Sequence, residues 1–164
     1  MEYFVQHTET ITNHEPIKYK KYLAIALFMA IVGLVFYFSA QPASVSKSQS
    51  QVVLNIFHKL GFEDFTMRFV RKAAHFTLFA TVALAITLVL NFKFKGLKLF
   101  LSSFLISATI GGLNEFHQMF VPGRGPQIKD VMINASGALV GVIFMATCLY
   151  IYKRYDSNKK AHAL

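Results

Sequence analysis

The chain has 164 residues, of which 54% are hydrophobic and only 15% are charged. Soluble domains average about 25% charged residues, so this chain has too few charges to cover a water-facing surface. Its apolar content also excludes an intrinsically disordered chain. The net charge is +9, and the basic residues flank apolar segments, which favours membrane lipids over nucleic acid as partners. A single cysteine excludes an intrachain disulfide and a cysteine-based zinc cluster. We predict an integral membrane protein and expect no cofactor.

Four apolar segments are long enough to cross a bilayer as helices. The hydrocarbon core is about 30 Å thick and requires about 20 helical residues. The segments are continuous rather than alternating, and backbone groups in lipid must be bonded within the segment, which favours helices over strands. We therefore predict an all-α membrane protein, a bundle of four transmembrane helices. The helices are expected at about residues 22–40, 73–90, 97–120 and 131–152.

The distribution of basic residues predicts the orientation of this bundle. Cytoplasmic segments of membrane proteins are enriched in Lys and Arg. The segments 1–21, 91–98 and 153–164 together hold 10 Lys and Arg residues, and the two other connections hold the remaining seven. We therefore expect both termini in the cytoplasm. Residues 1–21 would be an N-terminal tail, 22–152 the membrane domain and 153–164 a basic C-terminal tail.

The two outer connections differ in composition. Residues 41–51 are rich in Ser and Gln and begin with Gln41-Pro42, so we expect a loop. Residues 52–60 carry apolar residues at helical spacing, which predicts a short helix at the membrane interface. Residues 121–126 place two Gly and two Pro around Arg124, which predicts a tight loop that presents this side chain to an anionic group.

Polar and ionisable residues gather at the predicted outer end of the bundle. Arg71 and His75 are four residues apart and so lie on one face of a helix. Glu115 lies near the interface, where a carboxylate is costly unless it is paired or hydrated. Each residue alone is also explained by a headgroup contact or an exposed helix end, but their shared depth favours a polar pocket. The predicted ligand-binding residues are Arg71, Lys72, His75, Glu115, His117, Gln118, Arg124 and Asp130.

Small side chains form stripes on the third and fourth predicted helices. Ser103, Ser107 and Gly111 follow one another at helical spacing, and Gly137 and Gly141 form a GxxxG pair. Such residues allow membrane helices to approach closely. The predicted helix-packing residues are Gly111, Asn134, Gly137 and Gly141.

Four motifs, in order along residues 22–152, resemble the VanZ-like family of bacterial membrane proteins. They are Phe38-Ser-Ala-Gln-Pro42, Arg71-Lys-Ala-Ala-His75-Phe, Asn114-Glu-Phe-His-Gln118 continuing to Pro-Gly-Arg124, and Asp130-Val-Met-Ile-Asn134-Ala-Ser-Gly137. Members of this family typically have an acidic residue where this chain has Asn114, a departure that argues against a mechanism with two adjacent carboxylates. The resemblance implies a multi-pass protein of the cell membrane in a Gram-positive host. It also implies a cell-envelope role, because the family's namesake is associated with low-level resistance to teicoplanin.

Three functional hypotheses follow. In the first, a non-enzymatic envelope protein uses Arg71, Lys72 and Arg124 to hold a lipid-linked or phosphate-bearing envelope polymer or a glycopeptide. In the second, a membrane-embedded hydrolase or transferase acts on a lipid-linked substrate, with His75 or Glu115 as general base. In the third, the chain is an accessory subunit of a larger membrane complex. The oligomeric state and the identity of the ligand are left open.

We expect no metal ion. His75, His117, Glu115 and Asp130 are residue types that bind metals, but Arg71 and Arg124 would compete for the same carboxylates.

Overall fold

The computed structural model describes residues 2–125 and 127–161, with side chains from Lys18 onward. Within these ranges the chain is all helical, without a strand. The helices are α1 (Glu2–Ser39), α2 (Ala43–Lys59), α3 (Met67–Leu90), α4 (Gly96–Gln118) and α5 (Ile128–Ala161). Four of them contain segments long and apolar enough to cross a membrane: Lys18–Ser39, Met67–Leu90, Gly96–Gln118 and Ile128–Lys160. The prediction of an all-α protein with four membrane spans is therefore confirmed at this level.

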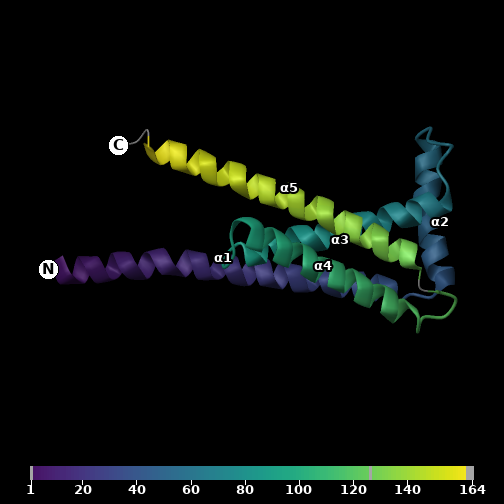
Figure 1. Ribbon diagram of the computed structural model, residues 1–164, viewed down its shortest axis with the longest axis horizontal. Coiled ribbons are helices and arrows are strands. Elements are labelled where there is room, and N and C mark those ends of the chain that lie inside the picture. Colours follow the sequence, from purple (N-terminus) through teal and green to yellow (C-terminus); the bar gives the residue numbers. More distant parts are fainter. Residues whose placement is uncertain (1, 126, 162–164) are drawn as a thin grey trace.

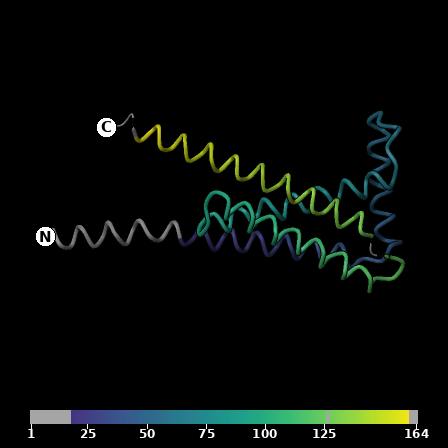
Figure 2. The backbone as a smooth tube through the Cα atoms, in the orientation of Figure 1, coloured from purple at the N-terminus to yellow at the C-terminus, as the bar shows by residue number. Residues whose placement is uncertain are grey.

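Helix α3 is at the centre of the bundle and packs against all four other helices. Its most extensive interface is with α5, and α4 also packs against both of them. Helices α1 and α4 run in one direction and α3 and α5 in the other, so the end of α1, the start of α3, the end of α4 and the start of α5 meet (Figure 1). Helix α2 lies across this end of the bundle, as the backbone trace in Figure 2 shows.

The glycines of α5 lie directly against the backbone of α3. A Cβ atom added to Gly137 would collide with the carbonyl oxygen of Phe76, and one added to Gly141 would collide with that of Ala80. A Cβ on Gly111 of α4 would lie 3.1 Å from the Cβ of Asn134 on α5. Without a hydrophobic driving force in lipid, this close approach supplies the dispersion contacts that hold membrane helices together.

Two clusters of buried apolar residues join α3 to its neighbours. Val35 of α1 packs with Phe79 and Val82 of α3. Ala83 of α3 packs with Ala138 and Val142 of α5, beside partly buried Phe100 and Phe104 of α4. Small residues on both helices therefore contribute to the α3–α5 contact.

The prediction of a loop at residues 41–51 was wrong, because α2 includes residues 43–51. Two of its hydroxyl groups are satisfied within the helix: Ser48 and Ser50 donate to the carbonyl oxygens of Ser44 and Ser46, over 3.2 Å and 2.8 Å. Pro42, which suggested a loop, stands at the N-terminal boundary of the helix. The predicted short helix at 52–60 is the second half of this longer one.

Three helices extend beyond their predicted boundaries, whereas α4 ends at Gln118, before the predicted residue 120. Helix α3 begins at Met67 instead of residue 73, after Thr66, whose side chain accepts a hydrogen bond from the backbone N–H of Phe69 over 3.3 Å. Helix α5 continues to Ala161, so the predicted tail at 153–164 is helical as far as the structure describes it. The apolar segments mark the hydrocarbon span, whereas a helix can continue into the polar interface.

Candidate functional site

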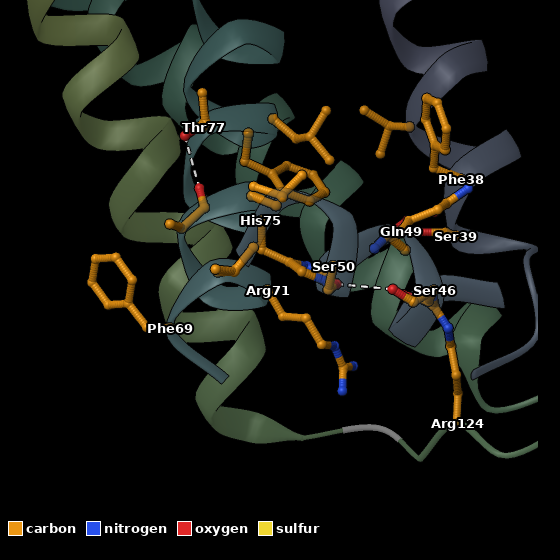
Figure 3. A pocket seen from close by; sticks show the side chains of 18 of the residues that line it. Phe38, Ser39, Ser46, Gln49, Ser50, Phe69, Arg71, His75, Thr77 and Arg124 are labelled. Carbon is orange, nitrogen blue, oxygen red and sulfur yellow. Dashed lines mark hydrogen bonds between the residues drawn. The ribbon is translucent and has the colours of Figure 1, made fainter. Parts of the chain in front are cut away.

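A cavity of about 380 Å³ lies at the end of the bundle where α2 crosses it (Figure 3). Its walls come from the end of α1, one side of α2 and the first half of α3. Asn114 of α4 and Arg124 of the loop between α4 and α5 complete it. The site thus draws on segments that are nearly 90 residues apart in the chain, Val35 to Arg124.

The loop that carries Arg124 is fixed by its own turn and by α2. The backbone N–H of Arg124 donates to the carbonyl oxygen of Val121 over 3.1 Å, and Gly123 adopts a φ of +73° that disfavours other residues. The N–H of Ala43, the first residue of α2, donates to the carbonyl oxygen of Pro122 over 3.2 Å. The start of α2 and the position of Arg124 are therefore coupled.

Three of the eight predicted ligand-binding residues, Arg71, His75 and Arg124, line the cavity. In Figure 3 both arginine side chains lie on the same side of the cavity, below His75. Burial lowers the pKa of Arg124, the positive charge of Arg71 lowers it further, and Glu115 opposes both effects. Among the residues that the structure describes, no carboxylate lies within salt-bridge distance of either guanidinium group. An arginine stays protonated in a protein, so the cavity holds two positive charges without a direct counterion.

His75 is held by a buried polar chain that crosses three helices. Its Nδ1 lies 3.2 Å from Oδ1 of Asn134 on α5, and Nδ2 of Asn134 donates to Oε1 of Glu115 on α4 over 3.3 Å. Asn134 is 0% exposed and Glu115 3%. Because an amide oxygen only accepts, Nδ1 of His75 carries the hydrogen. Glu115 does not line the cavity; it is connected to His75 through Asn134, and its Oε1 also lies 3.8 Å from Nδ1 of His75.

Asn114 also lines the cavity, at 0% exposure, and neither its Oδ1 nor its Nδ2 has a hydrogen-bond partner. A buried amide without partners costs about 1–3 kcal/mol per unpaired group, so a ligand or water at this position would be stabilised. Members of the VanZ-like family that the motifs resemble typically have an acidic residue at the position of Asn114. The amide of Asn114 offers both a hydrogen-bond donor and an acceptor.

The remaining predicted residues surround the cavity without lining it. His117 is half-buried, and its ring meets that of Phe36 edge-to-face at 5.8 Å. Gln118 is buried and donates to Oγ of Ser39 over 3.1 Å, which ties α4 to the end of α1. Lys72 is exposed on α3, and Asp130 is half-buried in the first turn of α5.

Sequence reasoning missed the contribution of α2. Ser46, Gln49 and Ser50 line the cavity, but they fall in the segment that was expected to be a loop. The absence of Gly and Pro between residues 43 and 60 was the signal that could have revealed the helix. Asn134 was assigned to helix packing, and its bridging role was missed. A polar amide within an apolar segment was the signal that Asn134 bonds to side chains of neighbouring helices.

Among the described residues, no three His, Cys, Asp or Glu side chains converge closely enough to hold a metal ion.

The family model described as VanZ/LLP1 matches residues 24–150. The chain belongs to the VanZ family. The resemblance drawn from the four motifs is thereby confirmed, and the matched range contains every residue that lines the cavity. Comparisons with curated proteins and with solved structures give no match. The family match and the four apolar helices together identify a VanZ-like membrane protein.

Proposed function

We propose that this VanZ-like protein binds an anionic, phosphate-bearing component of the bacterial cell envelope in the cavity beside α2. The observation that carries the proposal is the pair of guanidinium groups, Arg71 and Arg124, which line one cavity without a carboxylate in salt-bridge distance among the described residues. Two like charges in a partly buried site are unfavourable without an anion. A guanidinium also presents a planar fork of donors that matches phosphate oxygens.

The other polar groups complete the recognition. Asn114 offers a donor and an acceptor without partners, and His75, oriented by Asn134 and Glu115, presents the other edge of its ring. Exposed Lys72 attracts the anion from outside, while Asp130 balances the local positive charge. His117 and Gln118 fix the end of α1 against α4, where Ser39 forms part of the wall.

The cavity faces the outer side of the cell membrane in this proposal. The excess of basic residues in the segments 1–21, 91–98 and 153–164 supports cytoplasmic termini, which puts α2 and the cavity outside. There the protein would meet lipid-linked envelope polymers and glycopeptides, so a change in teicoplanin susceptibility is an expected consequence.

The test is complementation of a strain that lacks the protein, with teicoplanin susceptibility and growth under envelope stress as readouts. Arg124→Lys should behave like the deletion, because an ammonium group cannot reproduce the fork of the guanidinium. Arg68→Lys is the matched control, since Arg68 is exposed on α3 and does not line the cavity. Wild-type behaviour of Arg124→Lys, at equal protein level and where the deletion has a phenotype, would refute the proposal.

One observation favours an enzyme as the second candidate. The ring of His75 is fixed at Nδ1 by Asn134, which leaves Nε2 as the atom that can accept a proton, as in a general base. A hydrolase or transferase acting on a lipid-linked substrate would use this atom, with Arg124 stabilising the charge that develops. His75→Gln would then abolish product formation while anion binding persists; loss of binding alone would favour the non-enzymatic function.

A further inference from the structure

We infer that the ligand of this cavity is a membrane lipid with a phosphate-bearing headgroup, which enters sideways from the outer leaflet and lays its acyl chain along α3. The headgroup part of this inference rests on the proposed function. The chain-binding part rests on separate observations: the apolar half of the cavity, its depth, and the residues at its edge.

The cavity has a polar end and an apolar end. Arg71 lies near the start of α3 and Arg124 in the loop after α4, whereas apolar Val35, Leu78 and Phe79 line the cavity further into the helices. Figure 3 shows Arg71, His75 and Thr77 following one another along α3, from the polar end toward the apolar one. A phosphate ion alone would leave the apolar end facing water or empty, but an amphiphile matches both ends at once.

The apolar end lies within the membrane span. The apolar segment of α3 begins at residue 73, and Phe79 lies six residues further on, which corresponds to about 9 Å along a helix. Because the hydrocarbon core is about 30 Å thick, this end lies among the acyl chains of the nearer leaflet. An acyl chain is the natural occupant of an apolar cavity at that depth.

Exposed residues at the edge of the cavity lie inside the span. Ala74 and Thr77 both line the cavity and are exposed, although they belong to the membrane-spanning part of α3. The hydroxyl of Thr77 donates to the carbonyl oxygen of Ala73 over 2.7 Å, so it leaves no unsatisfied donor toward lipid. The cavity is therefore bordered by a lipid-compatible surface.

Helix α2 continues this surface at the membrane interface. It lies across the end of the bundle, roughly at right angles to the spans (Figure 1), which is the orientation of a helix in the membrane plane. One face carries exposed Val52 and Ile56, and exposed Leu60 follows directly after the helix. The adjoining face places Val53 in the cavity wall. A lipid beside α2 would thus find an apolar path from the leaflet into the cavity.

The test uses the purified full-length chain in a neutral sugar detergent and native mass spectrometry with three probes. Dioleoyl phosphatidic acid carries both parts of the expected ligand, glycerol 3-phosphate carries the head alone, and dioleoylglycerol carries the chains alone. Thr77→Trp should block the apolar end. Thr109→Trp is its matched control, because Thr109 is exposed on the span of α4 and does not line the cavity.

We expect phosphatidic acid to bind at least about tenfold more tightly than either fragment, a difference of about 1.4 kcal/mol. Thr77→Trp should remove that advantage and leave glycerol 3-phosphate binding unchanged, whereas Thr109→Trp should bind as the parent does. Equal binding of phosphatidic acid and glycerol 3-phosphate, insensitive to Thr77→Trp, would overturn the lipid inference and leave the proposed anion site standing. Equal binding of phosphatidic acid and dioleoylglycerol would overturn both.

Discussion

Asn134 of α5 donates a hydrogen bond from Nδ2 to Oε1 of Glu115 on α4, over 3.3 Å, at a depth where both side chains are almost completely buried. Its Oδ1 faces His75 of α3 at 3.2 Å, so one amide connects three helices. Nδ1 of His75 also lies 3.8 Å from Oε1 of Glu115. These contacts fix the register of α5 relative to α3 and α4 at the end of the bundle that carries the cavity. Gly137 and Gly141, which follow on α5, set the distance between α5 and α3.

Replacing this amide should destabilise the protein. Asn134→Leu removes both hydrogen bonds and leaves His75 and Glu115 without their partner, which we expect to lower the free energy of unfolding by about 1–3 kcal/mol. Thermal unfolding in detergent measures the change. Ser136→Leu on the same helix is the control, because Ser136 is exposed and bonds only within α5. Equal melting of Asn134→Leu and the parent would show that the bridge contributes no stability.

The glycines at the α3–α5 contact should not tolerate even a methyl group. Gly137→Ala and Gly141→Ala each place a Cβ against a backbone carbonyl oxygen of α3, which cannot move away as a side chain can. We expect each to cost about 1–3 kcal/mol, the range for overpacking a well-packed interior.

Gly33→Ala and Gly112→Ala are the controls for the glycine contact, since nothing lies within 4 Å of a Cβ at either position. In these two the change should be neutral or stabilising, because alanine favours a helix over glycine by about 1 kcal/mol. If all four variants melt together, α5 does not approach α3 as closely as described.

Cysteine labelling tests the orientation of the bundle. In a Cys148→Ser background, Ser48→Cys on α2 should react with an impermeant thiol reagent in intact cells, and Ser157→Cys near the end of α5 should react only after lysis. Both positions are exposed, so access to the reagent depends on the side of the membrane. The reverse pattern would place the cavity on the cytoplasmic side and contradict an envelope ligand outside.

The four spans could be predicted from sequence because their apolar length is a direct consequence of bilayer thickness. Helix α2 was missed because its Ser and Gln residues suggested a loop, although residues 43–60 contain no Gly or Pro. Ser48 and Ser50 donate to carbonyl oxygens within the helix, contacts that composition does not reveal. Pro42 was interpreted as part of a loop, but it lies at the N-terminal boundary of α2.

Three of the eight predicted site residues line the cavity, and the hydrogen bonds that connect the site were not predicted. Arg71, His75 and Arg124 were chosen because ionisable groups at membrane depth need partners, and they do line one cavity. That Asn134 bridges His75 and Glu115 depends on the register between α4 and α5, where a Cβ on Gly111 would lie 3.1 Å from the Cβ of Asn134. A helical stripe indicates which residues share a face, but it does not indicate which neighbour that face meets.

The most direct test of the central claim is calorimetric titration of the purified protein in neutral detergent with glycerol 3-phosphate. We expect Arg71→Gln and Arg124→Gln each to weaken binding at least about tenfold, equivalent to about 1.4 kcal/mol. Arg154→Gln, at an exposed position on the distant part of α5, should leave the affinity within about twofold, or about 0.4 kcal/mol. Absence of binding by the parent, or equal affinities for all three variants and the parent, would contradict an anion site between Arg71 and Arg124.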